Sequence, residues 1–164
     1  ASGRAVQVIG VRIDVFSVCR RPPSWTRDLT SQYAERCRPG LEVRFDCVAP
    51  GPSSKSSAER CADESARLTR RFPNKAPVLA LDEAGIQMNS RKFASALDRL
   101  RQDYDQITVV IGGADGLDQS LRDRALAAWS LSAMTLPHLL VQVVLAEQLY
   151  RAWTIINGHP YHRD

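Results

Sequence analysis

Three glycines follow the most strand-like segment of the chain. Every residue of Ile107–Ile111 is β-branched, and Gly112, Gly113 and Gly116 lie within the next five positions. Glycine has no Cβ atom, so the backbone can approach a ligand closely and adopt positive φ angles. A helix that starts after such a loop could also bind an anion. The loop matches no dinucleotide-binding or P-loop signature, so a ligand loop and a plain strand-to-helix turn both fit it.

An uncharged segment is a second candidate binding loop. It comprises Leu131, Ser132, Ala133, Met134, Thr135 and Leu136, and Pro137 and His138 follow it. The backbone N–H and C=O groups of such a loop need partners, which a nucleobase-like ligand could supply. The alternative is an internal connection packed in the core.

The C-terminal tail combines side chains suited to proton transfer, stacking and phosphate contact, namely Tyr161, His162 and Arg163. The alternative is a polar terminus without a role. The helix expected before the tail, over 138–156, is apolar around most of its circumference. We expect it to pack on a second subunit, with Glu147, Tyr150 and Arg151 at or near the interface, because one small core cannot bury so much apolar surface. A central helix in a monomer is the other interpretation.

Several reaction classes find no support in the sequence. The four cysteines, at positions 19, 37, 47 and 61, form no CxxC pair and have no neighbouring histidines, so we expect reduced thiols and no metal site. No Ser-His-Asp set or nucleophilic Cys-His pair stands out. This pattern argues against a hydrolase and favours group transfer from a bound donor.

Apolar strands alternate with helices along the chain, which predicts an α/β domain with a mostly parallel sheet. The expected strands are 12–18, 41–48, 78–81, 107–111 and 129–132, and the expected helices are 24–36, 57–71, 89–102, 118–127 and 138–156. We expect Ser24 to cap the first helix. The second helix should bury an apolar face formed by Ala58, Cys61, Ala62, Ala66 and Leu68. Ligands bind at the carboxyl ends of parallel strands, which here means the loops after Leu81, after Ile111 and around Met134.

The charge of the chain is unevenly distributed. Residues 1–75 carry 14 basic and 8 acidic side chains, whereas residues 76–164 carry 8 and 10. A basic N-terminal half suits binding to a polyanion such as nucleic acid. The alternative explanation is a solvated arginine-rich surface. We find neither a membrane-spanning run nor a secretion signal, and expect a cytoplasmic protein.

Three segments together resemble a known family. Val110–Gly116, Trp129–His138 and Glu147–Asp164 are similar to the RlmH family. These methyltransferases modify N3 of a pseudouridine in helix 69 of the bacterial large-subunit (23S) rRNA, and they act on assembled ribosomes. The resemblance implies a SPOUT fold: a parallel sheet with helices on both faces and a deep C-terminal trefoil knot. It also implies a homodimer formed through the C-terminal helix, with S-adenosylmethionine (SAM) as cofactor.

The resemblance also assigns roles to residues. By position, the cofactor-binding residues are Leu81, Gly112, Gly113, Gly116, Leu131, Ser132, Ala133, Met134, Thr135 and Leu136. Tyr161 and His162 would act on the target base as catalytic residues, and no metal is expected. The RNA-contacting residues would be Arg20, Arg21, His138, Arg151 and Arg163.

The match also suggests where the domain begins. Residues 12–18 correspond to the family's first strand, with Cys19 in place of a usual glycine, so residues 1–10 are expected to be an extension and residues 11–164 a single domain. Two other classes stay open: a catalytically silent RNA-binding SPOUT dimer, and an α/β protein that binds another nucleotide.

Overall fold

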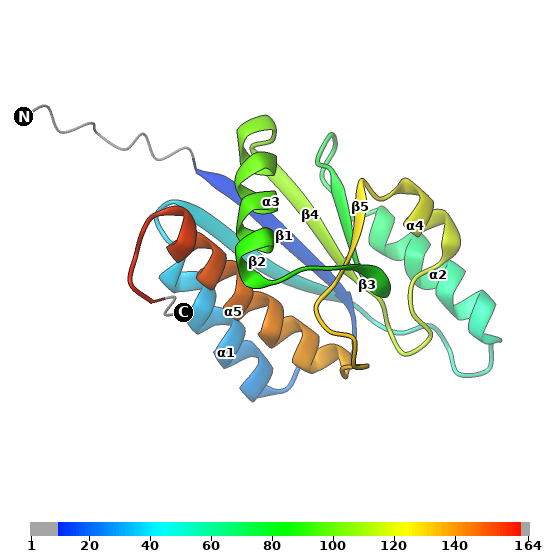
Figure 1. Ribbon diagram of the computed structural model, residues 1–164. Helices are drawn as coiled ribbons and strands as arrows, with labels where there is room; N and C mark the ends of the chain where they lie inside the picture. Colours follow the sequence, from blue (N-terminus) through cyan, green and yellow to red (C-terminus); the bar gives the residue numbers. More distant parts are fainter. Residues whose placement is uncertain (1–9, 162–164) are drawn as a thin grey trace, which may run out of the picture.

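Strands and helices alternate through the whole described part of the chain, which is residues 10–161 of a computed structural model (Figure 1). The elements are β1 (Val11–Val18), α1 (Ser24–Arg36), β2 (Leu41–Val48), α2 (Ser57–Thr69), β3 (Val78–Gln87), α3 (Ser90–Asp103), β4 (Gln106–Ile111), α4 (Gln119–Arg124), β5 (Ala127–Ser130) and α5 (His138–Ile156). The predicted alternation is confirmed. The extension predicted over residues 1–10 lies, except for Gly10, outside the described residues.

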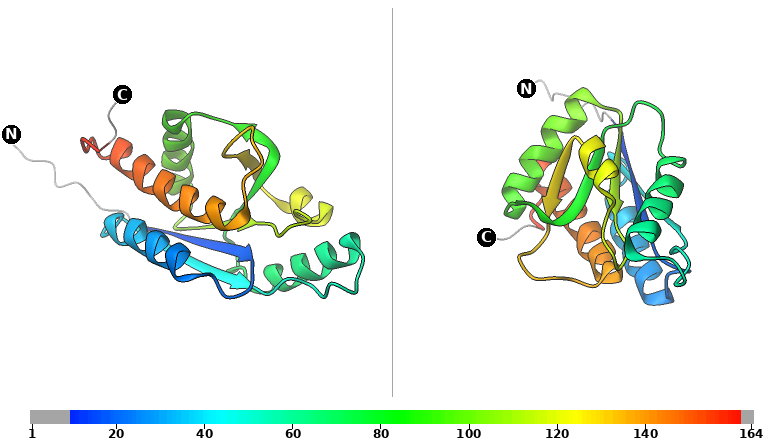
Figure 2. Two further views of the ribbon diagram at one scale, coloured as in Figure 1. Left: turned by 90° about the horizontal axis from the view of Figure 1, so that it is seen from below. Right: turned by 90° about the vertical axis from the view of Figure 1, so that its right-hand side faces the viewer.

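The five strands form one sheet with the order β2-β1-β4-β3-β5, and each neighbouring pair is parallel. Helices α1, α3 and α5 cover one face and α2 and α4 the other (Figure 2). Each face of the sheet has its own hydrophobic core. Because successive side chains of a strand point to opposite faces, Ile13 and Val15 pack in the core under α3 and α5, and Phe16 and Val18 pack in the core under α2 and α4. The predicted α/β architecture, with helices on both faces, is confirmed.

The helix starts show which local signals determine the structure. A reciprocal capping box joins Ser56 and Glu59 at α2, and the Asn89 side chain caps α3, as such residues usually do. The predicted cap of α1 is wrong. Ser24 is already helical, and the preceding Pro23 is the N-cap, with φ −63° and ψ 161° and no side-chain hydrogen bond. Its ring fixes φ and leads the chain directly into the helix.

Helix α2 does not bury the predicted apolar face. Of the five residues expected there, only Leu68 is buried, whereas Glu64 and Ser65 are buried as well. The Glu64 carboxylate accepts a hydrogen bond from the Gly51 N–H (2.8 Å), and the Ser65 hydroxyl accepts one from the Asp118 N–H (3.3 Å). This face of α2 is polar because it packs against loops whose backbone groups need partners.

Strand β3 is longer than predicted because it resumes after an irregularity. It pairs with β4 and β5 up to Leu81, and pairing with β5 starts again at Ile86. Between them, the Asp82 carboxylate accepts a hydrogen bond from the Ala84 N–H (2.9 Å). Gly85 passes so close to β5 that a Cβ atom there would lie 2.7 Å from the carbonyl carbon of Ala128. The sequence 82–85 looks like a turn, which conceals the strand beyond it.

Helix α5 lies between α1 and α3 on one face of the sheet (Figure 1). Leu145 and Leu149 are fully buried in that core, but Leu140 is 43% exposed. On the adjacent α1, Trp25 and Leu29 are 43% and 37% exposed. By length and composition alone α5 is apolar enough to cross a membrane, a criterion that core helices of soluble proteins also meet. Part of its apolar surface remains uncovered within one chain.

Candidate active site

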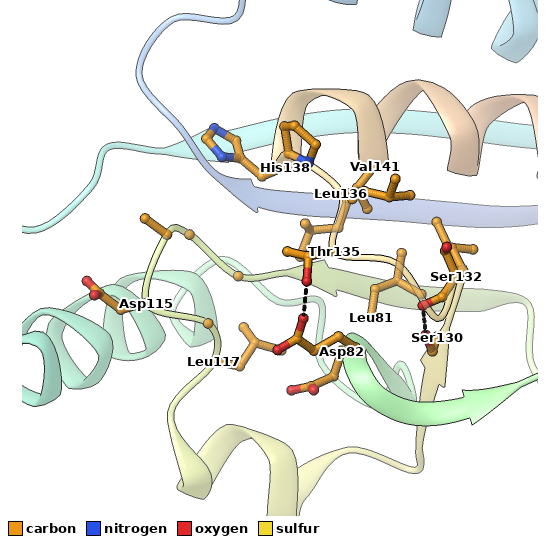
Figure 3. A pocket seen from close by; sticks show the side chains of 18 of the residues that line it. Leu81, Asp82, Asp115, Leu117, Ser130, Ser132, Thr135, Leu136, His138 and Val141 are labelled. Atoms are coloured by element: carbon orange, nitrogen blue, oxygen red, sulfur yellow. Dashed lines mark hydrogen bonds between the residues drawn. The ribbon is translucent and has the colours of Figure 1, made fainter.

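A cavity of about 670 Å³ opens beside the irregularity of β3 and at the carboxyl ends of β4 and β5 (Figure 3). The glycine loop forms one wall, and the segment 131–136 forms another. The first turn of α5 closes it with His138 and Val141. The volume lies within the range of about 300–1,000 Å³ that small-molecule sites occupy. The position agrees with the edge of the sheet at which the sequence predicted a site.

The glycine loop is closed tightly on itself. The Gly116 N–H donates to the Gly113 carbonyl (3.0 Å), and Gly116 adopts a φ of +79°. A Cβ atom on Gly112 would lie 2.6 Å from the carbonyl carbon of Gly116. Glycine is therefore required at 112 for space and favoured at 116 for conformation. All three glycines of the loop line the cavity.

Helix α2 holds the glycine loop from outside the cavity. The Arg60 guanidinium pairs with the Asp115 carboxylate (2.9 Å) and donates to the Lys55 carbonyl (2.7 Å). The Cys61 thiol donates to the Asp115 carbonyl (3.2 Å). The hydrogen bond from Arg60 lowers the pKa of Asp115 below its usual value. Asp115 is therefore a charged anchor for the loop and a poor candidate for a proton acceptor at neutral pH.

The uncharged loop is held by its own hydroxyl groups and by that of Ser130 at the end of β5. Ser130 donates to the Ser132 carbonyl (2.8 Å; Figure 3), and the Ser132 hydroxyl accepts a bond from the Met134 N–H (2.9 Å). Thr135 reaches across to the Glu83 carboxylate (3.0 Å). These bonds fix the course of the loop. Met134, with 77% of its surface exposed, is free to contact a bound molecule.

The structure brings nearly all predicted cofactor residues together. Leu81, Gly112, Gly113, Gly116, Leu131, Ser132, Met134, Thr135 and Leu136 line the cavity, whereas Ala133 does not. His138, predicted to contact RNA, lines it too. Arg20 and Arg21 are exposed after the end of β1 and do not line the cavity. Among residues 10–161, no group of three or more potential ligands could hold a metal ion.

The described part of the tail lies elsewhere on α5. The Tyr161 hydroxyl donates to the Glu147 carboxylate (3.3 Å), and its ring centroid lies 4.6 Å from that of Tyr150. Arg151 pairs with Glu147 (2.9 Å) and lies 5.1 Å from the centroid of the Tyr161 ring. We call Glu147, Tyr150, Arg151 and Tyr161 the tail cluster; none of them lines the cavity. His162 and Arg163 lie outside the described residues.

Burial and the negative charge of Glu147 both raise the pKa of Tyr161. The phenol is therefore protonated at neutral pH and acts as a hydrogen-bond donor. This geometry suits a residue that orients another group better than one that removes a proton.

An ion pair in the cavity wall was not predicted. Arg122 of α4 pairs with Asp82 at 3.0 Å, and both line the cavity. The position of Asp82, directly after an apolar strand, is a usable signal. Nothing in the sequence predicts a role for Arg122. It belongs to a short helix, and only the tertiary structure brings it to the cavity.

Comparison with known proteins places the chain in a class. A family model described as a predicted SPOUT methyltransferase matches residues 11–162. The chain therefore belongs to the SPOUT methyltransferases. A crystal structure of a probable methyltransferase from Bordetella pertussis Tohama I has a similar fold, with a TM-score of 0.54 and 12% identity over 90% of this chain and 98% of that one.

Curated relatives narrow the class to one family. Ribosomal RNA large subunit methyltransferase H of Polynucleobacter asymbioticus is 39% identical over 154 residues, which are 94% of this chain and 100% of that protein. The enzyme of the same name from Methylococcus capsulatus is 38% identical over 155 residues, 93% and 100% of the two chains. The predicted similarity to the RlmH family is confirmed.

Proposed function

We propose that this protein is a SAM-dependent methyltransferase that modifies N3 of a pseudouridine in helix 69 of 23S rRNA, on assembled ribosomes. The observation that carries the proposal is the cavity between the glycine loop and the segment 131–136, in a chain similar to large-subunit rRNA methyltransferases over nearly its full length. The specific base follows from the family resemblance. The cytoplasm is the expected location for such a reaction.

The cavity fits the cofactor in size and chemistry. Backbone groups of Leu81 and of the segment 131–136 would hold the adenosine part, and the glycine loop allows close contact along one side. Bound SAM would supply a methyl group activated by its positive sulfonium. The task of the chain is then to align donor and acceptor, which can contribute several orders of magnitude to a rate.

The tail cluster would act on the target base. Tyr161 is held as a protonated donor beside Glu147 and Arg151, and we assign Tyr161 and His162 the roles of orienting the base and assisting loss of its N3 proton. Arg20, Arg21, His138, Arg151 and Arg163 are the proposed RNA contacts. The basic front half of the chain suits a folded RNA surface recognised through its backbone.

A homodimer would bring the cavity of one copy to the tail of the other. The exposed apolar residues of α1 and α5, Trp25, Leu29 and Leu140, lie on adjacent helices. A second copy packed there would cover them. Light scattering should give twice the mass of one chain, and Leu140→Glu should shift it towards the monomer. A monomeric wild-type protein would contradict this assembly.

We also propose the deep trefoil knot of the SPOUT fold for the C-terminal segment. It is compatible with the course of the chain from β5 at the sheet edge through the segment 131–136 to α5 between α1 and α3. Single-molecule stretching should give an unfolded chain shorter than its full contour length. A chain that extends fully would remove the proposal.

The function is tested in cells that lack the protein. Mass spectrometry of helix 69 should show loss of the N3 methyl group, restored by the wild-type gene and not by a Gly112→Val variant. An unchanged methylation state would overturn the assignment. Calorimetry with SAM, ATP and NAD separates the alternatives, because only the methyltransferase predicts binding of SAM at about one site per chain.

A further inference from the structure

An ion pair between Asp82 and Arg122 lines the cavity beside the glycine loop. The Arg122 Nε atom lies 3.0 Å from the Asp82 carboxylate, whose side chain is 10% exposed. The Asp82 carboxylate is also fixed by the Ala84 N–H (2.9 Å), and Asp82 is one of the residues that line the cavity (Figure 3). Arg122 is more open, with 38% of its side chain exposed. The Asp82 carboxylate is therefore held rigidly, and the Arg122 guanidinium keeps further N–H groups that could donate to a ligand.

The guanidinium of Arg122 runs along the glycine loop. Its Nη2 atom lies 3.3 Å from the position that a Cβ atom on Gly116 would take. The absence of a side chain at 116 thus leaves the room that Arg122 uses. Strand β3 supplies the acidic residue and α4 the basic residue, and both line the cavity.

The charges of the cavity determine where an anion can bind. Among its described lining residues, Arg122 is the only arginine or lysine. The carboxylates of Glu83 and Asp115 already accept hydrogen bonds, from Thr135 and Arg60. A carboxylate on a bound molecule would therefore find its strongest partner at Arg122, since guanidinium groups bind carboxylates through charge-assisted hydrogen bonds.

We propose that Asp82 and Arg122 form the subsite for the amino-acid end of the cofactor, an inference that rests on the proposed function. SAM carries an α-carboxylate and an α-ammonium group at its methionine end and no other anion. Arg122 donates to the carboxylate, and Asp82 accepts from the ammonium group. The segment 131–136 is left to hold the uncharged adenosine end. The amino-acid end of the cofactor is thus bound by charged side chains, and the adenosine end by an uncharged loop.

The test compares two ligands that differ only at that end. S-adenosylhomocysteine carries the amino-acid group, and 5′-methylthioadenosine lacks it. In calorimetry, Arg122→Ala should weaken binding of S-adenosylhomocysteine by about tenfold or more and change the binding of methylthioadenosine by less than about twofold. Asp82→Asn keeps the oxygen that accepts from Ala84 and should show the same selective loss.

The matched control is Arg124→Ala. Arg124 lies on the same short helix, 5.9 Å from the ring of Phe72, and does not line the cavity. It should change neither affinity. Retained binding of methylthioadenosine shows that each variant is folded with an intact cavity. An equal loss for both ligands, or no loss for S-adenosylhomocysteine, would overturn the subsite while leaving the proposed function in place. A wild-type protein that binds neither ligand would overturn both.

Discussion

The cavity and the tail cluster share helix α5 but are built by different means. Two walls of the cavity are loops whose course depends on glycines and hydroxyl groups. The tail cluster consists of aromatic and charged side chains that hold one another through an ion pair and ring contacts. The cavity walls are shaped by backbone conformation, and the tail cluster is held by contacts between side chains. Changes in the two should therefore have separable effects.

The largest expected effect is loss of cofactor binding in Gly112→Val. The new side chain would meet the backbone of Gly116, whose carbonyl carbon lies 2.6 Å from the position of a Cβ atom. Backbone cannot move aside cheaply, so SAM affinity should fall by about 100-fold or more in calorimetry. The control is Ala66→Val, at an exposed position of α2 that does not line the cavity. Normal affinity in Gly112→Val would show that this loop does not hold the cofactor.

The next effect separates the two regions directly. Tyr161→Phe removes the hydroxyl that donates to Glu147 and should lower methylation of ribosomes by about 10- to 100-fold. Its SAM affinity should stay near that of the wild type, because Tyr161 does not line the cavity. The variant keeps the aromatic ring that packs on Tyr150, so the fold is conserved. Loss of SAM affinity instead of activity would place Tyr161 with the cofactor.

A smaller effect concerns stability alone. Gly40 lies against Trp153 near the end of α5, and a Cβ atom on Gly40 would overlap the Trp153 ring. Gly40→Ala should lower the free energy of unfolding by about 1–3 kcal/mol, measured with denaturant. SAM affinity below the melting temperature should be unaffected. Gly10→Ala, with nothing within 4 Å, is the neutral control, and an equal loss there would point to a general cause.

The smallest effect depends on pH. The folded-state pKa of Tyr161 is raised by burial and by Glu147. Its contribution to stability is therefore present below the unfolded pKa of about 10 and is lost as the pH rises through the folded pKa. The difference in unfolding free energy between wild type and Tyr161→Phe should shrink above about pH 10. A difference that stays constant up to about pH 12 would show that the hydroxyl does not ionise under a penalty.

The sequence predicted the elements that have a strong local signal. Ile107–Ile111 and the helix from His138 to Ile156 were placed at nearly their observed bounds, because long apolar runs and prolines mark them. The second half of β3 could not be seen, since Asp82 to Gly85 reads as a turn. The burial of Glu64 could not be seen either, because its partner Gly51 comes from a loop and is chosen by the tertiary structure.

The candidate site was predictable in its loops and not in its charges. The three glycines indicated that the backbone could approach a ligand closely. The family resemblance then assigned Gly112 and the segment 131–136 to one binding site. Arg122 became visible only when the structure placed it 3.0 Å from Asp82. The side chains of an exposed helix give no sign of what they face until the packing is known.

The position of both sites on α5 has a consequence for genetics. Val141 of the cavity and Glu147 of the tail cluster are six residues apart on this helix, about 9 Å along its rigid axis, so the two sites of one chain stay separate. In the proposed dimer, each active site combines the cavity of one chain with the tail of the other. When one chain is changed at Gly112 and its partner at Tyr161, one of the two sites still has an intact cavity and an intact tail. Co-expressed variants that assort at random should therefore regain about a quarter of wild-type methylation, although each alone is nearly inactive.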